Sequence, residues 1–121
     1  MSNRILVVED QEDNRKIIRD LLSASGYQSM EATTGDQGLA MAEREVPDLI
    51  LMDIQLPGLD GYEVTRRIRA NPALKHIPII AVTSYALSGD DQKAYAAGCN
   101  GYVTKPFSPR QLLAKIREYL K

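Results

Sequence analysis

The chain has 121 residues, of which 44% are hydrophobic and 26% are charged, and its formal net charge is −1. This length and composition predict a single domain over residues 1–121, and the near balance of 15 basic and 16 acidic side chains argues against nucleic acid or a membrane surface as a partner. The lone Cys99 excludes a disulfide framework, no apolar run approaches the ~18 residues of a membrane span, and a strand-like run from Ile5 leaves no room for a signal peptide, so we expect a cytoplasmic protein.

The first strand–helix pair is predicted from an apolar run and one helical face. Residues 4–8 predict a buried strand, which Glu9 and Asp10 close. Asp13 or Asn14 is expected to cap the helix that follows. The buried face of this helix is expected to carry the side chains that recur at helical spacing, Ile17, Ile18, Leu21 and Leu22.

The second strand–helix pair is more polar. Residues 27–32 predict a strand at an edge of the sheet, because few of their side chains are apolar. A helix is expected from Gly35 until Pro47 stops it. Its buried side is expected to carry Leu39, Ala42 and Val46.

Residues 48–53 predict a central strand that ends in a carboxylate. Four consecutive apolar residues precede Asp53, and a strand that is apolar on both faces is typical of a parallel sheet covered by helices on both sides. Ligands bind outside the carboxyl ends of the strands in such sheets, so Asp53 is expected at the rim of a site. A loop with Pro57 and Gly58 separates this strand from a helix expected at about 60–70.

The fourth pair combines a second doubly apolar strand with a weak helix. Residues 77–83 predict the strand, which ends in Thr83. The apolar side of the helix expected at 87–97 is mostly alanine, with Leu87 and Tyr95 as the larger candidates.

The fifth pair closes the chain. Residues 101–104 predict a short strand, which Lys105 and Pro106 end. The last helix is expected to begin near Ser108 or Pro109. Its buried side chains are expected to be Leu112, Leu113, Ile116 and Leu120.

The alternation of strands and helices predicts an α/β fold. Parallel strands need crossover helices, and these crossovers are right-handed. Because the second strand is predicted at an edge and the first, third and fourth are predicted at the centre, we expect a doubly wound, flavodoxin-like (βα)5 parallel sheet in the strand order 2-1-3-4-5.

This topology collects charged and hydroxyl side chains at one edge of the sheet. Glu9, Asp10, Asp53, Thr83 and Lys105 all stand at or just past a strand end. Two unit charges ~4.5 Å apart repel by roughly 4 kcal/mol at an effective dielectric of about 20, so three carboxylates there favour a hard divalent cation such as Mg²⁺. A carboxylate nucleophile with a metal, a lysine and a hydroxyl suits phosphoryl transfer, in which Asp53 would attack phosphorus.

Four motifs at strand ends now indicate a family. They are VVED at 7–10, DIQLPGLDG at 53–61, VT at 82–83 and YVTKP at 102–106. In this order and spacing the chain resembles, from Ile5 to Leu120, the response-regulator receiver domains of bacterial two-component signalling. Within that family it is most similar to stand-alone receivers of the DivK and CheY type.

The resemblance implies a role for each site residue. Asp53 is the phosphoacceptor, and Asp10, Asp53 and the backbone carbonyl of Gln55 ligate Mg²⁺ directly, while Glu9 contributes through water. Lys105 binds the phosphoryl group, and its peptide bond to the following proline is expected to be cis.

The resemblance also implies a switch and partners. Thr83 moves toward the phosphoryl group and Tyr102 turns inward with it, although Ser84 replaces the alanine that is common after this threonine. The donor is a phosphohistidine on a sensor histidine kinase or a histidine phosphotransfer protein, and a downstream protein target reads the face made by the fourth helix, fifth strand and fifth helix. The chain is expected to be a monomer or weak dimer. It is not expected to act on external substrates, and would catalyse only its own phosphotransfer and slow autodephosphorylation.

Other functions remain open at this point. The chain could be a non-catalytic receiver-like binding module, or a receiver fragment of a larger regulator or hybrid kinase. A flavodoxin-like cofactor binder is disfavoured because the first loop is acidic and lacks a glycine-rich phosphate cradle. An aspartyl phosphatase is disfavoured because Gln55 stands where such enzymes place a second aspartate.

Overall fold

Five parallel strands form the sheet of the computed structural model, which describes residues 3–83 and 90–120. The strand order is β2-β1-β3-β4-β5, as the sequence predicts. The elements follow one another as β1 (Arg4–Val8), α1 (Glu12–Ala24), β2 (Gln28–Ala32), α2 (Gly35–Glu45), β3 (Leu49–Asp53), α3 (Gly61–Ala70), β4 (Ile79–Thr83), α4 (Asp90–Ala97), β5 (Gly101–Thr104) and α5 (Pro109–Tyr119).

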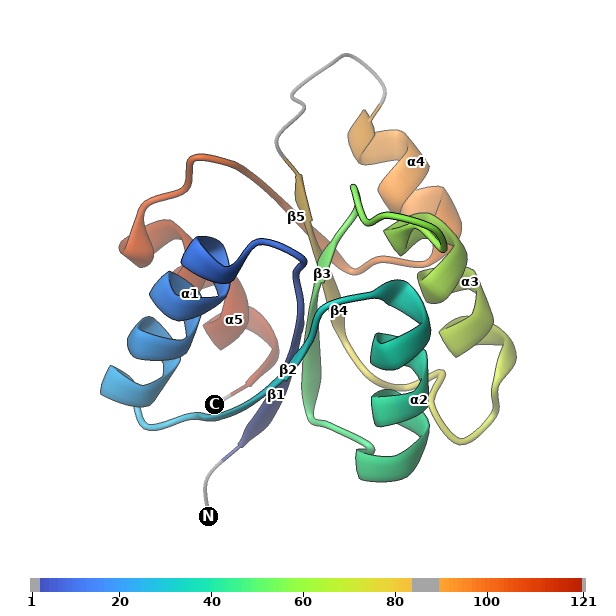
Figure 1. Cartoon of the computed structure of the whole chain (residues 1–121), viewed down its shortest axis with the longest axis horizontal. Helices are drawn as coiled ribbons and strands as arrows, with labels where there is room; N and C mark the ends of the chain where they lie inside the picture. Colours follow the sequence, from blue (N-terminus) through green and yellow to red (C-terminus); the bar gives the residue numbers. More distant parts are fainter. Residues whose placement is uncertain (1–2, 84–89, 121) are drawn as a thin grey trace.

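Helices cover both faces of the sheet, with α1 and α5 on one side and α2, α3 and α4 on the other (Figure 1). Alternate residues of β1 enter two separate apolar clusters: Ile5 and Val7 pack with α1 and α5, whereas Leu6 and Val8 pack on the other side. Every residue of β3 and β4 is buried. This confirms that the doubly apolar runs are central strands.

Three helices begin at the side-chain caps that their sequences favour. Thr34 caps α2 and Asp60 caps α3, each accepting a hydrogen bond from a backbone N–H in the first turn. Ser108 and Gln111 form a reciprocal capping box at α5, with Pro109 as the first helical residue.

The expected cap of α1 is wrong. This helix begins at Glu12, and the residue before it, Gln11, makes no side-chain capping hydrogen bond. Asp13 therefore lies inside the first turn, as does Glu12, where negative charge is favourable beside the positive end of the helix dipole.

Six apolar side chains are less buried than expected. Ile17 is 55% exposed because it is rotated by about 100° from Ile18, which faces the sheet. Val46 is 42% exposed because it ends α2 in the left-handed conformation, and Tyr95 of α4 is 48% exposed. Three leucines, Leu21, Leu39 and Leu113, are half-buried rather than buried.

Two further predictions concern the loops that follow β4 and β5. The Lys105–Pro106 peptide bond is cis, as expected. Ser84 and Leu87 lie outside the described residues.

Among the helices that are described, none combines the length and the hydrophobicity needed to cross a membrane.

Both ends of the described chain lie at the amino edge of the sheet, opposite the carboxyl ends of the strands (Figure 1). β1 begins there at Arg4. α5 returns to the same edge, since the hydroxyl of Tyr119 donates a 2.8 Å hydrogen bond to the carbonyl of Asn100, just before β5.

Candidate functional site

Three carboxylates meet at the carboxyl edge of β1 and β3, which are adjacent strands in the middle of the sheet. Glu9 and Asp10 follow β1, and Asp53 is the last residue of β3. These strands are adjacent, with Val8 opposite Met52, so one oxygen from each carboxylate lies within 4.8 Å of the others. Glu9 is only 1% exposed and Asp53 only 4%, which makes the cluster a partly enclosed site rather than a solvated acidic surface.

Lys105 reaches this cluster from the end of β5. Its Nζ lies 2.6 Å from Oε1 of Glu9 and 3.4 Å from Oδ2 of Asp53. The backbone N–H of Lys105 donates a 2.7 Å hydrogen bond to the carbonyl of Thr83, so the β4–β5 pairing extends one residue further and aims the lysine at the site. The four residues Glu9, Asp10, Asp53 and Lys105 are therefore brought together as the sequence predicts.

The loop after β3 holds the Asp53 carboxylate in place. The backbone N–H of Gln55 donates a 2.9 Å hydrogen bond to Oδ1 of Asp53. Gly61 packs directly against the carbonyl of Asp53, where a Cβ atom would collide with the backbone. The glycine therefore allows α3 to begin beside the strand end.

Thr83 and Tyr102 stand at different distances from the cluster. Thr83 ends β4 at the same edge of the sheet and is 2% exposed. Tyr102 lies in β5, is half-buried, and packs on the side of the sheet covered by α2, α3 and α4. The structure thus places the threonine at the site edge and the tyrosine outside the acidic cluster.

Burial and neighbouring charge shift the titration of two site residues. Burial raises the pKa of Glu9 to about 7; the hydrogen bond to Lys105 opposes this rise and the neighbouring Asp53 adds to it. Burial by itself would lower the pKa of Lys105, but the hydrogen bond to Glu9 and the charges of Asp53 and Glu9 outweigh it, so the pKa of the lysine is raised.

The donor set fits a magnesium ion. Three carboxylates against one ammonium leave an excess of negative charge when all four groups are ionised, and the carboxylates offer only hard oxygen atoms. Mg²⁺ prefers such oxygen ligands and keeps some of its water, so a few carboxylates suffice to hold it. The cluster of Glu9, Asp10 and Asp53 therefore offers the ligand atoms that a bound Mg²⁺ would need.

One residue beside the site is absent from the sequence-based predictions. Arg15 of α1 donates a 3.0 Å hydrogen bond from Nη1 to the backbone carbonyl of Glu9. From sequence alone, an arginine in the first turns of an amphipathic helix is expected to lie in solvent. The only signal for a contact with the preceding loop is the position of Arg15 around the helix axis.

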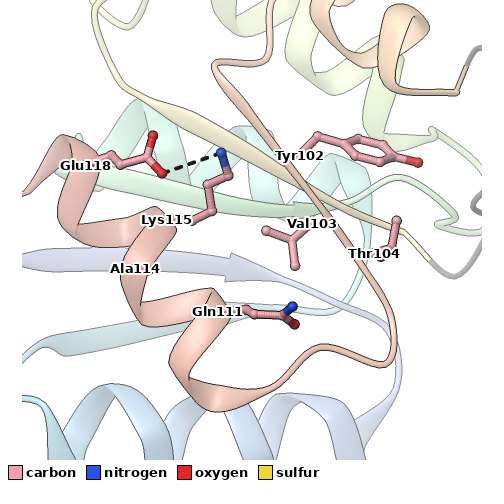
Figure 2. Close-up of a pocket in the computed structure, with 7 residues that line it drawn as sticks. All are labelled: Tyr102, Val103, Thr104, Gln111, Ala114, Lys115 and Glu118. Atoms are coloured by element: carbon pink, nitrogen blue, oxygen red, sulfur yellow. Dashed lines mark ion pairs between the residues drawn. The ribbon is translucent and has the colours of Figure 1, made fainter.

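A hollow of about 330 Å³ lies between β5 and α5 (Figure 2), and none of the three carboxylates lines it. A 3.4 Å ion pair joins Lys115 to Glu118 at its α5 side. Its lining residues are Tyr102, Val103, Thr104, Gln111, Ala114, Lys115 and Glu118. The hollow therefore lies on part of the face from which partners are expected to read the switch.

Comparisons with known proteins agree on one family. The model of the response regulator receiver domain matches residues 5–117. The polar-differentiation response regulator DivK of Brucella ovis is 43% identical to the chain over 120 residues, which are 99% of this chain and 98% of that protein.

Solved structures agree with the fold. The receiver domain of the sensor histidine kinase PA1611 from Pseudomonas aeruginosa PAO1, whose structure has a magnesium ion coordinated in the active-site cleft, superposes with a TM-score of 0.91 at 40% identity and covers 98% of both chains. The chemotaxis protein CheY4 of Vibrio cholerae superposes with a TM-score of 0.93 at 28% identity, covering 99% of this chain and 100% of that one. These matches confirm the expected flavodoxin-like architecture.

Proposed function

The chain belongs to the response regulator receiver family, and from this premise we propose that it signals by accepting a phosphoryl group on Asp53. The observation that carries the proposal is the position of Asp53 between two further carboxylates and the Lys105 ammonium. The Lys105 ammonium can attract the negative phosphoryl oxygens, and the carboxylates beside Asp53 could hold the divalent cation that offsets their own charge.

The transfer reaction follows from this arrangement. An oxygen of Asp53 attacks the phosphorus of a phosphohistidine, the P–N bond breaks, and the imidazole leaves with the bonding electron pair. The product is an acyl phosphate on Asp53 and a histidine that takes up a proton from water. The hydrogen bond from Gln55 N–H to Oδ1 orients the carboxylate for this attack.

Four residues would hold the metal. Asp10, Asp53 and the backbone carbonyl of Gln55 would bind Mg²⁺ directly, and Glu9 would bind it through water. When bound, Mg²⁺ supplies positive charge that neutralises the phosphoryl oxygens during transfer.

Two residues would bind the phosphoryl oxygens. Lys105, already 3.4 Å from Asp53, is a compact cation suited to this role. Thr83 at the end of β4 would donate its hydroxyl to the same group.

Phosphorylation would then be read at the surface. It adds about −1.5 to −2 charge at Asp53, to which Thr83 and Lys105 would respond, and Tyr102 would turn inward with Thr83. The face of α4, β5 and α5, with the hollow in Figure 2, would present the change to a downstream protein.

The family generally works with histidine kinases and downstream targets; a sensor histidine kinase or a histidine phosphotransfer protein is our proposed donor. The cytoplasmic location, the monomeric or weakly dimeric state, the single-domain boundary and the lack of activity on external substrates stay predictions.

A receiver segment of a hybrid kinase is the second candidate. It is favoured by the 40% identity to the receiver domain of a sensor histidine kinase. The chemistry at Asp53 would be the same in both cases, but the phosphoryl donor would then be tethered to the acceptor.

The test is phosphoryl incorporation from acetyl phosphate. We expect labelling of the wild type that requires Mg²⁺ and that falls to background in Asp53→Asn. Asp36→Asn is the matched control, because Asp36 is an exposed carboxylate in the first turn of α2 and should leave labelling unchanged. A folded wild type that takes no label would support the binding-module alternative, and full labelling of Asp53→Asn would mean that another residue is the acceptor.

A further inference from the structure

The turn that carries two of the three carboxylates is held from several directions. We call residues 9–11 the acidic turn. The N–H of Glu9 donates a 3.0 Å hydrogen bond to the carbonyl of Ala32, and the N–H of Gln11 donates a 3.1 Å hydrogen bond to Oε2 of Glu9. Arg15 adds the 3.0 Å hydrogen bond to the Glu9 carbonyl, which fixes the peptide plane that leads into Asp10.

Arg15 is itself fixed by a carboxylate on the neighbouring strand. Its Nε lies 3.4 Å from Oε1 of Glu31 in β2, and its side chain is 15% exposed. Arg19, one turn further along α1, donates a 2.6 Å hydrogen bond to the other oxygen of Glu31. A planar guanidinium can reach the carboxylate through Nε and the carbonyl through Nη1 at once, whereas the donors of a lysine all lie on one nitrogen.

From these contacts we propose that Arg15 is a positioning residue that holds the acidic turn in its metal-binding geometry and thereby sets the affinity for Mg²⁺. The inference rests on the proposed function, because it assumes that the carboxylate cluster binds this ion. Arg15 would act through the backbone of Glu9 and would touch neither the ion nor the phosphoryl group.

The physical reason is the repulsion among the carboxylates. Glu9, Asp10 and Asp53 have oxygens within 4.8 Å of one another, and mutual repulsion would move a mobile turn away from Asp53. A restrained turn keeps the ligands close, so less ordering is required when the ion binds. Glu31 is shared between Arg15 and Arg19, so a control that removes a neighbouring positive charge is needed to separate geometry from lost charge.

The first test compares Mg²⁺ affinity in two variants of α1. Arg15→Met removes the hydrogen bond, and we expect a three- to tenfold weaker affinity in an NMR titration of the backbone amides, where tenfold corresponds to about 1.4 kcal/mol. Removing a group that hydrogen-bonds the side chain of a metal ligand typically weakens metal affinity by about 10–100-fold. We expect a smaller loss here, because Arg15 hydrogen-bonds the backbone of Glu9 and not its side chain. The amide signal of Gln11 should shift in Arg15→Met before any Mg²⁺ is added.

Lys16→Met is the matched control. It removes a positive charge from the adjacent residue of the same helix, where Lys16 pairs with Asp20 in solvent, and it should leave the affinity unchanged. Glu31→Gln keeps Arg15 but weakens the ion pair that holds it, so it should reduce the affinity for Mg²⁺ by a smaller factor than Arg15→Met. The same variant replaces Arg15→Met in the test if Arg15→Met does not fold. Arg15→Lys should fall between the wild type and Arg15→Met.

The second test separates positioning from chemistry. At saturating Mg²⁺, labelling of Arg15→Met by acetyl phosphate should return to within twofold of the wild-type rate. A rate that stays low at saturation, or an affinity that falls equally in Arg15→Met and Lys16→Met, would overturn the role of Arg15, as would an unchanged affinity in Arg15→Met. A wild type that binds no Mg²⁺ would overturn the proposed function together with it.

Discussion

Glu9 is the site residue whose titration the fold changes most clearly. It is buried beside Asp53 and bonded to Lys105, and burial raises its pKa from an ordinary 4.5 to about 7. Between these two values the folded chain keeps a proton that the unfolded chain releases. The stability that the neutral carboxyl contributes is therefore complete below about pH 4.5 and is lost as the pH rises through about 7.

A pH series tests this consequence. We expect the free energy of unfolding of the wild type, minus that of Glu9→Gln, to fall by up to about 3 kcal/mol between pH 4.5 and 7.5, measured by urea unfolding with a chelator present. Glu12→Gln, a change at an exposed neighbour in the sequence, should give a difference that does not vary in this way. A flat difference for Glu9→Gln would show that its carboxyl titrates normally.

The sequence predicts the residues of the site better than the residues that hold them in place. Glu9, Asp10, Asp53 and Lys105 could be named because each follows a strand, and parallel strands share one carboxyl edge. The contact from Arg15 depends on the angle of α1 and on Glu31 in another strand, neither of which is encoded locally.

Among the elements, the amino end of β4 and the end of α4 are tied together by one arginine from α3. Arg69 donates hydrogen bonds of 2.8 Å to the carbonyl of Gly98, 2.7 Å to that of Ile77, 2.9 Å to that of Lys75, and 2.6 Å to Oδ1 of Asn100. Its burial lowers the pKa of the guanidinium. These four bonds join three segments at the edge of the molecule opposite the carboxylates.

We expect Arg69→Met to lower the free energy of unfolding by about 2–3 kcal/mol, because four acceptors, two of them in part-buried hydrogen bonds, lose a charged donor. Denaturant unfolding at pH 7 measures the loss. Arg66→Met removes an exposed arginine of the same helix that pairs with Glu63 and should cost less than about 1 kcal/mol. Equal losses in both variants would mean that the hydrogen bonds of Arg69 add nothing beyond an ordinary surface charge.

The sequence predicts the type and order of the helices and strands well, but it predicts less well which side chains of a helix are buried. Ser108, Pro109 and Gln111 spell a capping box that the structure contains, so α5 begins where expected. The position of Ile17 shows the opposite case: its spacing fits the apolar face of α1, yet the sheet takes up Ile18 and Leu22 and leaves Ile17 in solvent. Tertiary packing decides how wide a helical face is buried.

For the whole molecule, metal binding and folding should be linked. Glu9 and Asp10 are separated from Asp53 by more than forty positions in the chain, and only the β1–β3 pairing brings them together. An ion that needs all three can bind the folded chain and not the unfolded one. Mg²⁺ should therefore stabilise the fold, and the gain should grow with the logarithm of its concentration once this exceeds the dissociation constant.

The expected gain is about 1.4 kcal/mol in the free energy of unfolding at a Mg²⁺ concentration tenfold above the dissociation constant. Urea unfolding with and without Mg²⁺ measures it, and Asp10→Asn should lose most of the gain while Asp36→Asn keeps it. A gain of the same size in Asp10→Asn would point to weak binding elsewhere on the surface.

The strand order was the most predictable property of the molecule. The apolar run at residues 49–52 indicates a central strand and the mostly polar residues 28–31 indicate an edge strand, and the flavodoxin-like order 2-1-3-4-5 fits these positions. What composition leaves open is the distance at which strand ends meet, for example the 2.6 Å between Lys105 and Glu9, because sheet twist and loop conformation set it.

The return of α5 to the amino edge of the sheet has a practical use. Since β1 starts at that edge and α5 finishes there, a reporter protein or a surface linker could be attached through either terminus while the carboxylate cluster faces away from the attachment (Figure 1). An immobilised sensor made in this way would keep Asp53 accessible to a phosphoryl donor in solution.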